Sequence, residues 1–506
     1  MRNRWAVVGG VVFGVACLLR IGIVLGSRGG PSGNFGYDAG VYYTAADALI
    51  HGRLPYRDFV LLHPPAMMLA LTPFAVLGRL TSDHAGFMVA NTVFAVLGAV
   101  NAVLVVAIAR SAALPLRAAA LGGLFYAVWY GAVAAEFSAR LEPFSSFAFL
   151  CGMLALMARR MSRRRALILA GLGFGLAVSI KIWWIVPLIV VLAWYLRSSG
   201  TRRDVAPLVG GAVAAFVLID APFFLAAPGL MWRMVISDQL GRHGSNSSPL
   251  VRLDQISSLH SAFPSLSTGL QATVLLLIAA LAVVLGVAAW RVPAGRLFVI
   301  IAVAQLLVLL AAPTYFSYYS GYLAAAVALV VAAGAHGIRS TSRSGRLGPI
   351  VAVICVFLAT AATATALLTR PIKVVAPFPG APLAQAAAHV RCVVADSPMA
   401  LIELNVLSRD LAAGCPNWVD VSGRTYDVDA PPNAKPLSRP ANAKWQADLR
   451  RYLLSGNAMI IIRPATGYSA ETKRLFARLP VMIRVGQYSV YQVPPDHQVP
   501  AAPAGY

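Results

Sequence analysis

Long apolar runs separated by short polar connections make up most of this chain, from residue 5 to about residue 368. Each run approaches the ~20 residues that an α-helix needs to cross ~30 Å of hydrocarbon. The first run, from Trp5 to Gly26, is too long for the apolar core of a signal peptide and includes Arg20, so we expect a retained span. We expect about eleven spans, at residues 5–26, 86–109, 118–135, 143–158, 166–180, 182–196, 206–226, 268–290, 296–312, 320–336 and 348–368.

The connection between the first two spans, residues 27–85, is long and contains two further helical segments. The apolar piece that follows His63 is short and is interrupted by Pro73, which favours a position at the membrane surface. Residues 39–50 likewise predict an amphipathic juxtamembrane helix, with Asp38 as its N-cap.

The composition agrees with this pattern. Of the 506 residues, 58% are hydrophobic and only 12% are charged, and the mean hydropathy is +0.71. Soluble domains carry about twice that share of charged residues. We therefore expect an all-α polytopic membrane protein with a polar C-terminal region.

The net charge of +23 would suit nucleic-acid binding, but the positions of the basic residues indicate another cause. Arginines gather in alternate short connections between the expected spans, which is the positive-inside pattern. We therefore expect these connections and the N-terminus in the cytoplasm of a plasma-membrane protein, beside membrane lipid, and we expect no nucleic-acid partner. The basic groups lie at residues 2–4, 110–117, 159–165, 197–203, 291–296 and 339–346.

The same rule assigns the remaining loops to the outer side of the membrane. These loops hold carboxylates, histidines and tyrosines, so we expect the outer face to be the functional one. They cover residues 27–85, 136–142, 227–267 and 313–319.

The region from Pro371 onward has more prolines and polar residues and no long apolar run. Strand-like and helical segments alternate in it, which indicates a small α/β domain, placed outside the membrane by the span count. The expected strands begin near residues 392, 418, 458, 481 and 488, and the expected helices cover 397–407, 440–454 and 470–479. The predicted parts are a transmembrane region, 1–370, an extracytoplasmic domain, 371–493, and a disordered tail, 494–506.

The cysteines fit this division. Cys17, Cys151 and Cys355 lie in expected spans. Cys392 and Cys415 both lie in the outer domain, where disulfides persist, and each precedes an expected strand. Adjacent parallel strands would bring the two together, so we expect a disulfide between Cys392 and Cys415.

Several enzyme classes are disfavoured by motifs that the sequence lacks. It has no phosphate-binding Gly-x-x-x-x-Gly-Lys-Ser/Thr motif and no dinucleotide fingerprint. It also lacks His-Glu-x-x-His and paired Cys-x-x-Cys zinc signatures. A membrane ATPase and a zinc protease are therefore disfavoured, and no cofactor is predicted.

The first outer loop carries a set of motifs. An aromatic-Asp pair, Tyr37-Asp38, leads into a Gly-Val-Tyr helix, a Pro-Tyr-Arg-Asp-Phe turn at 55–59 and His63-Pro-Pro. With the spans that follow, this loop resembles the first outer loop of the GT-C glycosyltransferases, which are polytopic enzymes that use polyprenyl-phosphate-linked sugars. The resemblance implies a GT-C-like membrane region and such a sugar as the donor.

Two further motifs narrow the resemblance. Arg-Leu-Glu142-Pro at the start of the fourth span and the aromatic run 315–319 are similar to a bacterial branch of the superfamily. This branch resembles the protein O-mannosyltransferases and other polyprenyl-phosphomannose-dependent mannosyltransferases. Several of its members carry an outer-face domain similar to the C-terminal region here. This domain would either recognise the acceptor or have a purely structural role.

The resemblance implies roles for the loop carboxylates. Asp38 would be the general base that takes a proton from an acceptor hydroxyl, and the reaction would invert the anomeric centre. Alternatively, Asp38 only caps a helix. Many such enzymes have two adjacent acids here, whereas Ala39 follows Asp38, so Asp58 is the candidate for a second carboxylate and a divalent cation stays an open possibility.

Other residues are candidates for substrate binding. Arginines suit the departing phosphate because their fork matches its oxygens, although ordinary lipid headgroups are an alternative partner. Arg57 either binds substrate or pairs with a loop carboxylate, and His63 either contacts the donor or caps the next helix. The remaining aromatic and acidic candidates either line the sugar site or belong to the interfacial belt and polar pockets near span ends. The full set of binding candidates is Tyr37, Arg57, Asp58, His63, Glu142, Arg233, Arg242, Arg252 and Tyr319, with Lys181 as a further cation.

We therefore predict a glycosyltransferase, with mannose favoured and arabinose and other sugars possible. The acceptor would be a lipoglycan, a cell-wall glycan or a secreted protein. The alternative is a transporter or flippase for a lipid-linked glycan, but the sequence shows no clear internal repeat. The excess of arginine over lysine and the many Ala, Val and Gly residues are typical of a GC-rich bacterium such as an actinomycete.

Overall fold

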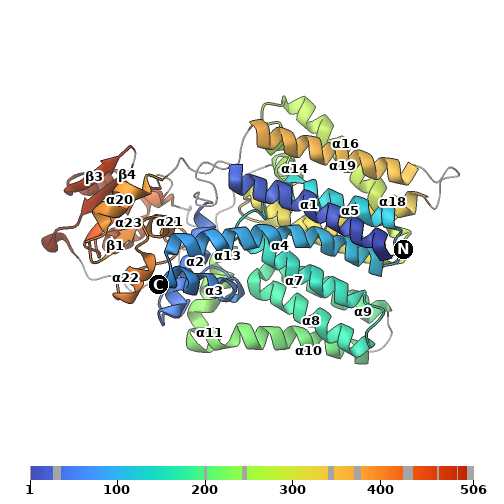
Figure 1. The fold of residues 1–506 in the computed structure, drawn as a ribbon, viewed down its shortest axis with the longest axis horizontal. Helices are drawn as coiled ribbons and strands as arrows, with labels where there is room; N and C mark the ends of the chain where they lie inside the picture. The colour runs from blue at the N-terminus through green and yellow to red at the C-terminus, as the bar shows by residue number, and fades with distance from the viewer. Residues whose placement is uncertain are drawn as a thin grey trace. The chain divides into compact units, whose positions relative to one another are not determined.

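The computed structural model describes residues 2–26, 36–198, 202–241, 248–339, 347–369, 378–424, 437–463, 466–486 and 488–498. Helices dominate the described chain, and a small sheet forms near its C-terminal end (Figure 1). The chain divides into two compact units, each built from segments that are distant in the sequence. The first unit comprises Met1–Ser27, Thr92–Ile219 and Gly244–Lys373, and the second comprises Arg28–Asn91, Asp220–His243 and Val374–Tyr506.

The first unit is a bundle of apolar helices. Helix α8 packs against α7 and α10, and α18 packs against α5, α16, α17 and α19. Its helices are α1 (Arg2–Gly26), most of α4 (Asp83–Ser111), α5 (Leu116–Val128), α6 (Tyr130–Val133), α7 (Leu141–Leu156), α8 (Arg163–Ile180), η2 (Ile182–Trp184), α9 (Ile185–Ser198), α10 (Arg202–Ile219), α14 (Pro249–Ser257), α15 (Leu259–Ala262), α16 (Thr268–Trp290), α17 (Pro293–Ala311), η4 (Ser317–Ser320), α18 (Gly321–Arg339) and α19 (Leu347–Thr369).

An apolar helix lies at each expected span within the described ranges. Six of the described helices are long and apolar enough to cross a membrane, namely α1, α4, α16, α17, α18 and α19. Helices α5, α7, α9 and α10 are apolar but shorter. The chain is therefore a multi-pass membrane protein. The span expected at 206–226 is divided at Asp220, where α10 has ended and α11 (Ala221–Ala226) begins with Pro222 in its first turn.

A buried polar network explains the arginine inside the first span. Arg20 pairs with Glu136 at 2.7 Å, and both side chains are wholly buried. Glu136 also accepts hydrogen bonds from Tyr126 at 2.6 Å and from Asn101 at 2.9 Å. An arginine in an apolar helix is tolerated when it faces the bundle interior and is paired, as here.

The second unit contains the first-loop helices and most of the C-terminal region. Helix α2 packs against α3, α21 and α22. Its helices are α2 (Tyr37–Ile50), α3 (Ala66–Leu80), α11, α12 (Pro228–Trp232), the π-helix η3 (Arg233–Ser237), α13 (Asp238–Leu240), α20 (Gly380–Ala387), α21 (Pro398–Glu403), α22 (Leu407–Ala412), η6 (Arg439–Ala441), α23 (Ala443–Leu453), α24 (Ala470–Ala477) and η8 (Pro495–His497).

The strands described in the C-terminal region form a single sheet with the order β1-β2-β4-β3. Strand β1 (Val393–Ala395) is parallel to β2 (Ala458–Ile461), whereas β4 (Tyr488–Gln492) is antiparallel to both β2 and β3 (Val481–Val485). Val394 lies opposite Met459 in the parallel pair. These strands occur where the sequence predicts them, and helices α23 and α24 lie close to their expected ranges.

Two expectations for the C-terminal region are wrong. Residues 418–421 form no strand, because Val419 has a φ of 63° and this left-handed backbone cannot continue an extended chain. The helix expected at 397–407 is two short helices, α21 and α22, which are separated by Asn405 with a φ of 54°. Asparagine is one of the few non-glycine residues that adopt this conformation readily.

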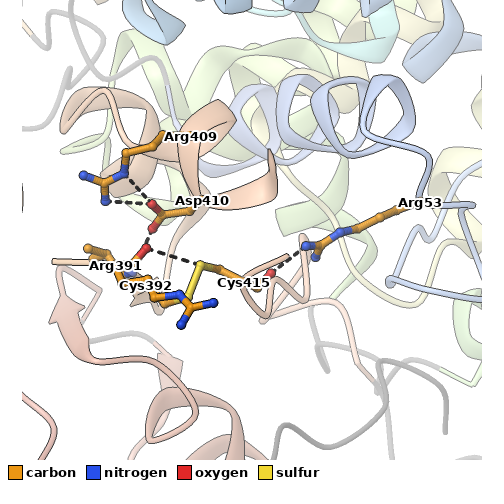
Figure 2. The surroundings of a disulfide bond; sticks show 7 residues. Arg53, Arg391, Cys392, Arg409, Asp410 and Cys415 are labelled. Carbon is orange, nitrogen blue, oxygen red and sulfur yellow. Dashed lines mark hydrogen bonds and ion pairs between the residues drawn. A yellow bond between two sulfur atoms is a disulfide. The ribbon is translucent and has the colours of Figure 1, made fainter. Parts of the chain in front are cut away.

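A disulfide joins Cys392 and Cys415, with Cα atoms 5.5 Å apart (Figure 2). Cys392 directly precedes β1, and Cys415 follows α22 rather than preceding a strand. Asp410 of α22 accepts a hydrogen bond from the backbone N of Val393 at 2.7 Å, which holds α22 beside β1. The disulfide therefore closes a loop that contains α21 and α22.

Candidate functional site

Asp38 lies in the first turn of α2, which begins at Tyr37. The expectation that Asp38 is the N-cap is wrong, because Gly36 occupies that position with a φ of 100°, a conformation that glycine adopts without steric cost. A carboxylate in the first turn lies close to the exposed N–H groups of the helix, which favour negative charge. The side chain is half-buried, so the helix start presents a carboxylate that is only partly exposed to water.

Tyr37, the neighbour of Asp38, is held by three groups from the C-terminal region. Its hydroxyl donates a hydrogen bond to Asp420 at 2.8 Å and accepts one from the backbone N of Ser422 at 2.8 Å. The guanidinium of Arg463 lies over its ring, 3.8 Å from the centroid. Burial and the neighbouring Asp420 raise the pKa of Tyr37 well above its ordinary value, so the phenol remains a hydrogen-bond donor.

The Pro-Tyr-Arg-Asp-Phe motif forms a tight turn. Tyr56 has a φ of 68° and is wholly buried, with its hydroxyl donating to the carbonyl O of His63 at 2.8 Å. Asp58 accepts a hydrogen bond from the backbone N of Leu54 at 2.7 Å. Arg57 holds the same carboxylate with two hydrogen bonds of 2.8 Å, and this contact lowers the pKa of Asp58. Asp58 is therefore ionised and engaged with Arg57.

His63 lies beside α2 rather than on the following helix. Its ring meets that of Tyr42 edge-on, with centroids 5.8 Å apart. Pro65 is the N-cap of α3, so the alternative in which His63 caps this helix is wrong. The prolines at 64 and 65 explain this, because a proline disfavours the helical conformation in the residue before it, which keeps His63 and Pro64 outside α3.

The three arginines that are candidates for phosphate binding, Arg233, Arg242 and Arg252, do not belong to one group in the structure. Arg233 is in the π-helix of the second unit and pairs with the buried Asp238, with Nε and Oδ1 3.8 Å apart. Arg242 lies outside the described residues. Arg252 belongs to the first unit, is 4% exposed, and lies over the ring of Tyr315 at 5.2 Å.

Glu142 and Lys181 form a buried ion pair in the first unit. Nζ of Lys181 is 2.9 Å from Oε1 of Glu142, and the two residues are 3% and 2% exposed. The ammonium also lies 4.4 Å from the ring centroid of Trp183 and 4.3 Å from that of Tyr319. Lys181 therefore occupies a small box of one carboxylate and two aromatic rings, an arrangement suited to holding a cation.

The candidates thus fall into two groups. Tyr37, Asp38, Arg57, Asp58, His63 and Arg233 lie in the second unit, and Glu142, Arg252 and Tyr319 lie in the first. Sequence reasoning missed Trp183, although its position two residues after Lys181 was a usable signal. It also missed Asp420, Ser422 and Arg463, because nothing in the sequence connects them with Tyr37.

Metal ligands do not cluster in the part of the chain that the structure describes. Within these residues, no group of three or more His, Cys, Asp or Glu side chains is placed to hold an ion.

The chain matches no family model and no curated protein. It is similar to solved structures. ArnT from Cupriavidus metallidurans matches with 14% identity over 99% of both chains in its apo state, with a TM-score of 0.60. The same protein bound to undecaprenyl phosphate matches with 13% identity over 98% of this chain and 99% of that one, with a TM-score of 0.58.

A second protein has a related structure. The oligosaccharyltransferase AglB from Archaeoglobus fulgidus, in complex with an inhibitory peptide and a dolichol-phosphate, matches with 13% identity over 90% of this chain and 69% of that one, with a TM-score of 0.50. At these identities the likeness shows the fold. The chain therefore has the GT-C fold that its first-loop motifs indicated.

Proposed function

We propose that this protein is an inverting glycosyltransferase that moves a sugar from a polyprenyl-phosphate donor to an acceptor hydroxyl. The observation that carries the proposal is a GT-C fold shared over nearly the whole chain with a structure bound to undecaprenyl phosphate. Asp38 on α2 supplies this fold with a carboxylate in the first-loop motif. Mannose is the preferred sugar because the loop and Glu142 motifs resemble the phosphomannose-dependent branch.

The donor needs little activation, because a phosphate on a lipid is already a good leaving group. The acceptor oxygen forms a bond to the anomeric carbon as the bond from that carbon to the phosphate oxygen breaks. Asp38 takes the hydroxyl proton, and polyprenyl phosphate leaves with the bonding electron pair. Attack on the face opposite the phosphate inverts the anomeric centre, and a positioned base contributes roughly 10²–10⁴-fold to the rate.

Cations and aromatic rings are available for the rest of the substrate. Arg233 is a candidate for the departing phosphate, since a guanidinium bonds phosphate oxygens through two parallel N–H groups. Lys181, whose charge Glu142 balances, and Tyr319 are candidates in the first unit. Arg57 is fully engaged with Asp58, so we assign it to the loop turn rather than to the substrate.

The reaction is expected on the outer face of the plasma membrane, with a lipoglycan, a cell-wall glycan or a secreted protein as the acceptor. The carrier alternative has no comparable support, whereas one of the related structures, AglB, is an oligosaccharyltransferase. A carrier would move the lipid-linked sugar across the bilayer and leave its sugar–phosphate bond intact.

The proposal is tested with purified protein in nanodiscs, a panel of radiolabelled polyprenyl-phosphate sugars and an alkyl mannoside acceptor. We expect transfer from the β-mannosyl donor to give an α-linked product, with arabinosyl and glucosyl donors slower. A parallel assay in liposomes measures transbilayer movement of the same donor. Movement of the donor without cleavage of its sugar–phosphate bond would contradict the proposal that the protein is a transferase. Repeating the transfer assay with increasing chelator measures any requirement for a divalent cation.

A further inference from the structure

Tyr37, the residue that precedes the candidate base Asp38, is held by the C-terminal region through both its hydroxyl and its ring. The Tyr37 hydroxyl has one acceptor, Asp420, and one donor, the N–H of Ser422, and its ring face is covered by Arg463. All these groups belong to the second unit together with α2. The hydroxyl therefore has both a donor and an acceptor partner and is engaged in structure rather than open to a ligand.

The groups that bind Tyr37 are themselves anchored to the sheet. Asp396, directly after β1, accepts hydrogen bonds from the backbone N of Ile462 at 2.8 Å and of Arg463 at 2.9 Å, just beyond β2. Arg463 then donates from Nη1 to the hydroxyl of Ser422 at 2.8 Å. The parallel strands β1 and β2 thus fix the backbone of Arg463, and its guanidinium reaches both Ser422 and the Tyr37 ring.

The same region touches α2 further along its length. Gly40 packs closely against Met399 of α21, where an added Cβ atom would stand 2.6 Å from the methionine sulfur. Asp47 accepts a hydrogen bond from the hydroxyl of Ser408 on α22 at 2.9 Å. Beyond the helix, Arg53 donates to the carbonyl O of Cys415 at 2.7 Å, beside the disulfide (Figure 2).

We infer that the C-terminal region is a positioning device for α2, with Tyr37 as the positioning residue that orients Asp38. This inference rests on the proposed function, because it assigns a role to groups around its candidate base. Tyr37 and Asp38 are consecutive in the first helical turn, so fixing the phenol fixes the backbone from which the carboxylate projects. A misplacement of about 1 Å in a catalytic group costs on the order of 100-fold in rate.

The first experiment compares Tyr37→Phe with wild type in the glycosyl-transfer assay. This change removes both hydrogen bonds of the hydroxyl and keeps the ring that Arg463 covers. We expect kcat to fall about 10- to 100-fold while KM for the donor stays within about twofold. Tyr488→Phe is the matched control, because it removes a buried tyrosine hydroxyl from β4 in the same unit, and we expect wild-type kinetics.

Three further measurements separate a positioning role of Tyr37 from a general effect on stability. Hydrogen exchange of the α2 amides should accelerate in Tyr37→Phe and not in Tyr488→Phe, with exchange in β1 and β2 unchanged. In a double-mutant cycle, Tyr37→Phe and Asp420→Ala should be non-additive in kcat, because each variant removes the hydrogen bond between the Tyr37 hydroxyl and the Asp420 carboxylate. Arg463→Lys should retain more activity than Arg463→Met, since a cation still covers the ring.

The outcomes distinguish this inference from the proposed function. If Asp38→Asn abolishes transfer while Tyr37→Phe keeps wild-type kcat and wild-type exchange of α2, the positioning role is overturned and the proposed function stands. If Asp38→Asn transfers sugar at the wild-type rate, the proposed base is wrong. A rise in KM at constant kcat in Tyr37→Phe would make Tyr37 a binding residue and would also overturn the inference.

Discussion

Lys181 carries a charge that is almost completely removed from water. Its compensation is local, from the Glu142 carboxylate at 2.9 Å and the rings of Trp183 and Tyr319. Deleting one partner of a buried ion pair leaves an uncompensated charge, whereas deleting both often costs little. The pair therefore matters to the folded state whether or not substrate uses it.

We predict that Lys181→Met destabilises the protein by about 3–5 kcal/mol, and that Lys181→Met combined with Glu142→Gln recovers most of this loss. Thermal unfolding of the purified variants measures it. Arg57→Met is the contrasting control, because the Arg57 side chain is 52% exposed and water screens its pair with Asp58, so we expect little change in the unfolding temperature. Equal losses of stability in Lys181→Met and in the double variant would contradict the conclusion that Lys181 and Glu142 compensate each other's charge.

Asp47 is a second residue with a large electrostatic cost. It is 1% exposed, and burial raises its pKa to about 7, although the Ser408 hydroxyl and the nearby Arg79 oppose the shift. His51 also lies close, with Nδ1 3.5 Å from its carboxylate. The folded state keeps a proton on Asp47 that the unfolded chain releases near pH 4. The folded state is therefore destabilised relative to the unfolded chain as the pH rises from about 4 to about 7.

We therefore predict that Asp47→Asn flattens the dependence of stability on pH in this window. The isosteric amide keeps an acceptor for Ser408 and carries no charge at any pH. The difference in unfolding free energy between variant and wild type should grow by up to about 1.4 kcal/mol per pH unit toward neutrality. Unfolding midpoints measured from pH 4 to pH 8 test this, and parallel profiles for the two proteins would count against it.

At the scale of elements, hydrophobic patterning identified the spans because a helix that crosses lipid needs a long apolar run. It also located both first-loop helices, although α2 is buried from Ala39 to Ala48 and is not the amphipathic helix that we expected. It missed the features that depend on single backbone angles. Val419 and Asn405 take left-handed conformations that interrupt an expected strand and an expected helix. Gly36 similarly moves the start of α2, so that Asp38 lies inside the helix rather than at its cap.

The disulfide-closed loop is the element that presents α21 and α22 to α2. Cys392 and Cys415 are 23 residues apart, and closing a loop of this size stabilises the folded state by about 3 kcal/mol through the unfolded chain. We predict that Cys392→Ser combined with Cys415→Ser lowers the unfolding temperature and accelerates hydrogen exchange in α22. The control is Cys151→Ser, which removes a free thiol. An unchanged unfolding temperature in the double variant would argue against a stabilising bridge.

At the scale of the whole molecule, the composition change near residue 371 suggested a boundary between two domains. Contacts group the chain differently, because residues 28–91 and 220–243 join the C-terminal region in one compact unit. Hydropathy could not reveal this grouping, since it depends on specific contacts such as Tyr37 with Asp420 and Arg53 with Cys415. The domain bounds derived from the sequence therefore stay a prediction.

Orientation in the membrane is also predicted from charge alone, and it can be measured. We expect a cysteine at Asp496 to react with a membrane-impermeant maleimide in intact cells, because the C-terminal region should face outward. A cysteine at Arg160 should react only after permeabilisation, because its arginine-rich connection should face the cytoplasm. Both positions are exposed, so access across the membrane decides the result. The reversed pattern would place the candidate site on the wrong side for this account.

The most direct test of the account is the single-turnover rate of sugar transfer by Asp38→Asn, with donor binding measured separately. The amide keeps the size of the side chain and cannot accept the proton, so we predict a rate lower by about 10²–10⁴-fold with donor affinity unchanged. Asp496→Asn removes the same charge from an exposed position in the same unit and should react like wild type. A rate for Asp38→Asn within twofold of wild type would contradict the central claim.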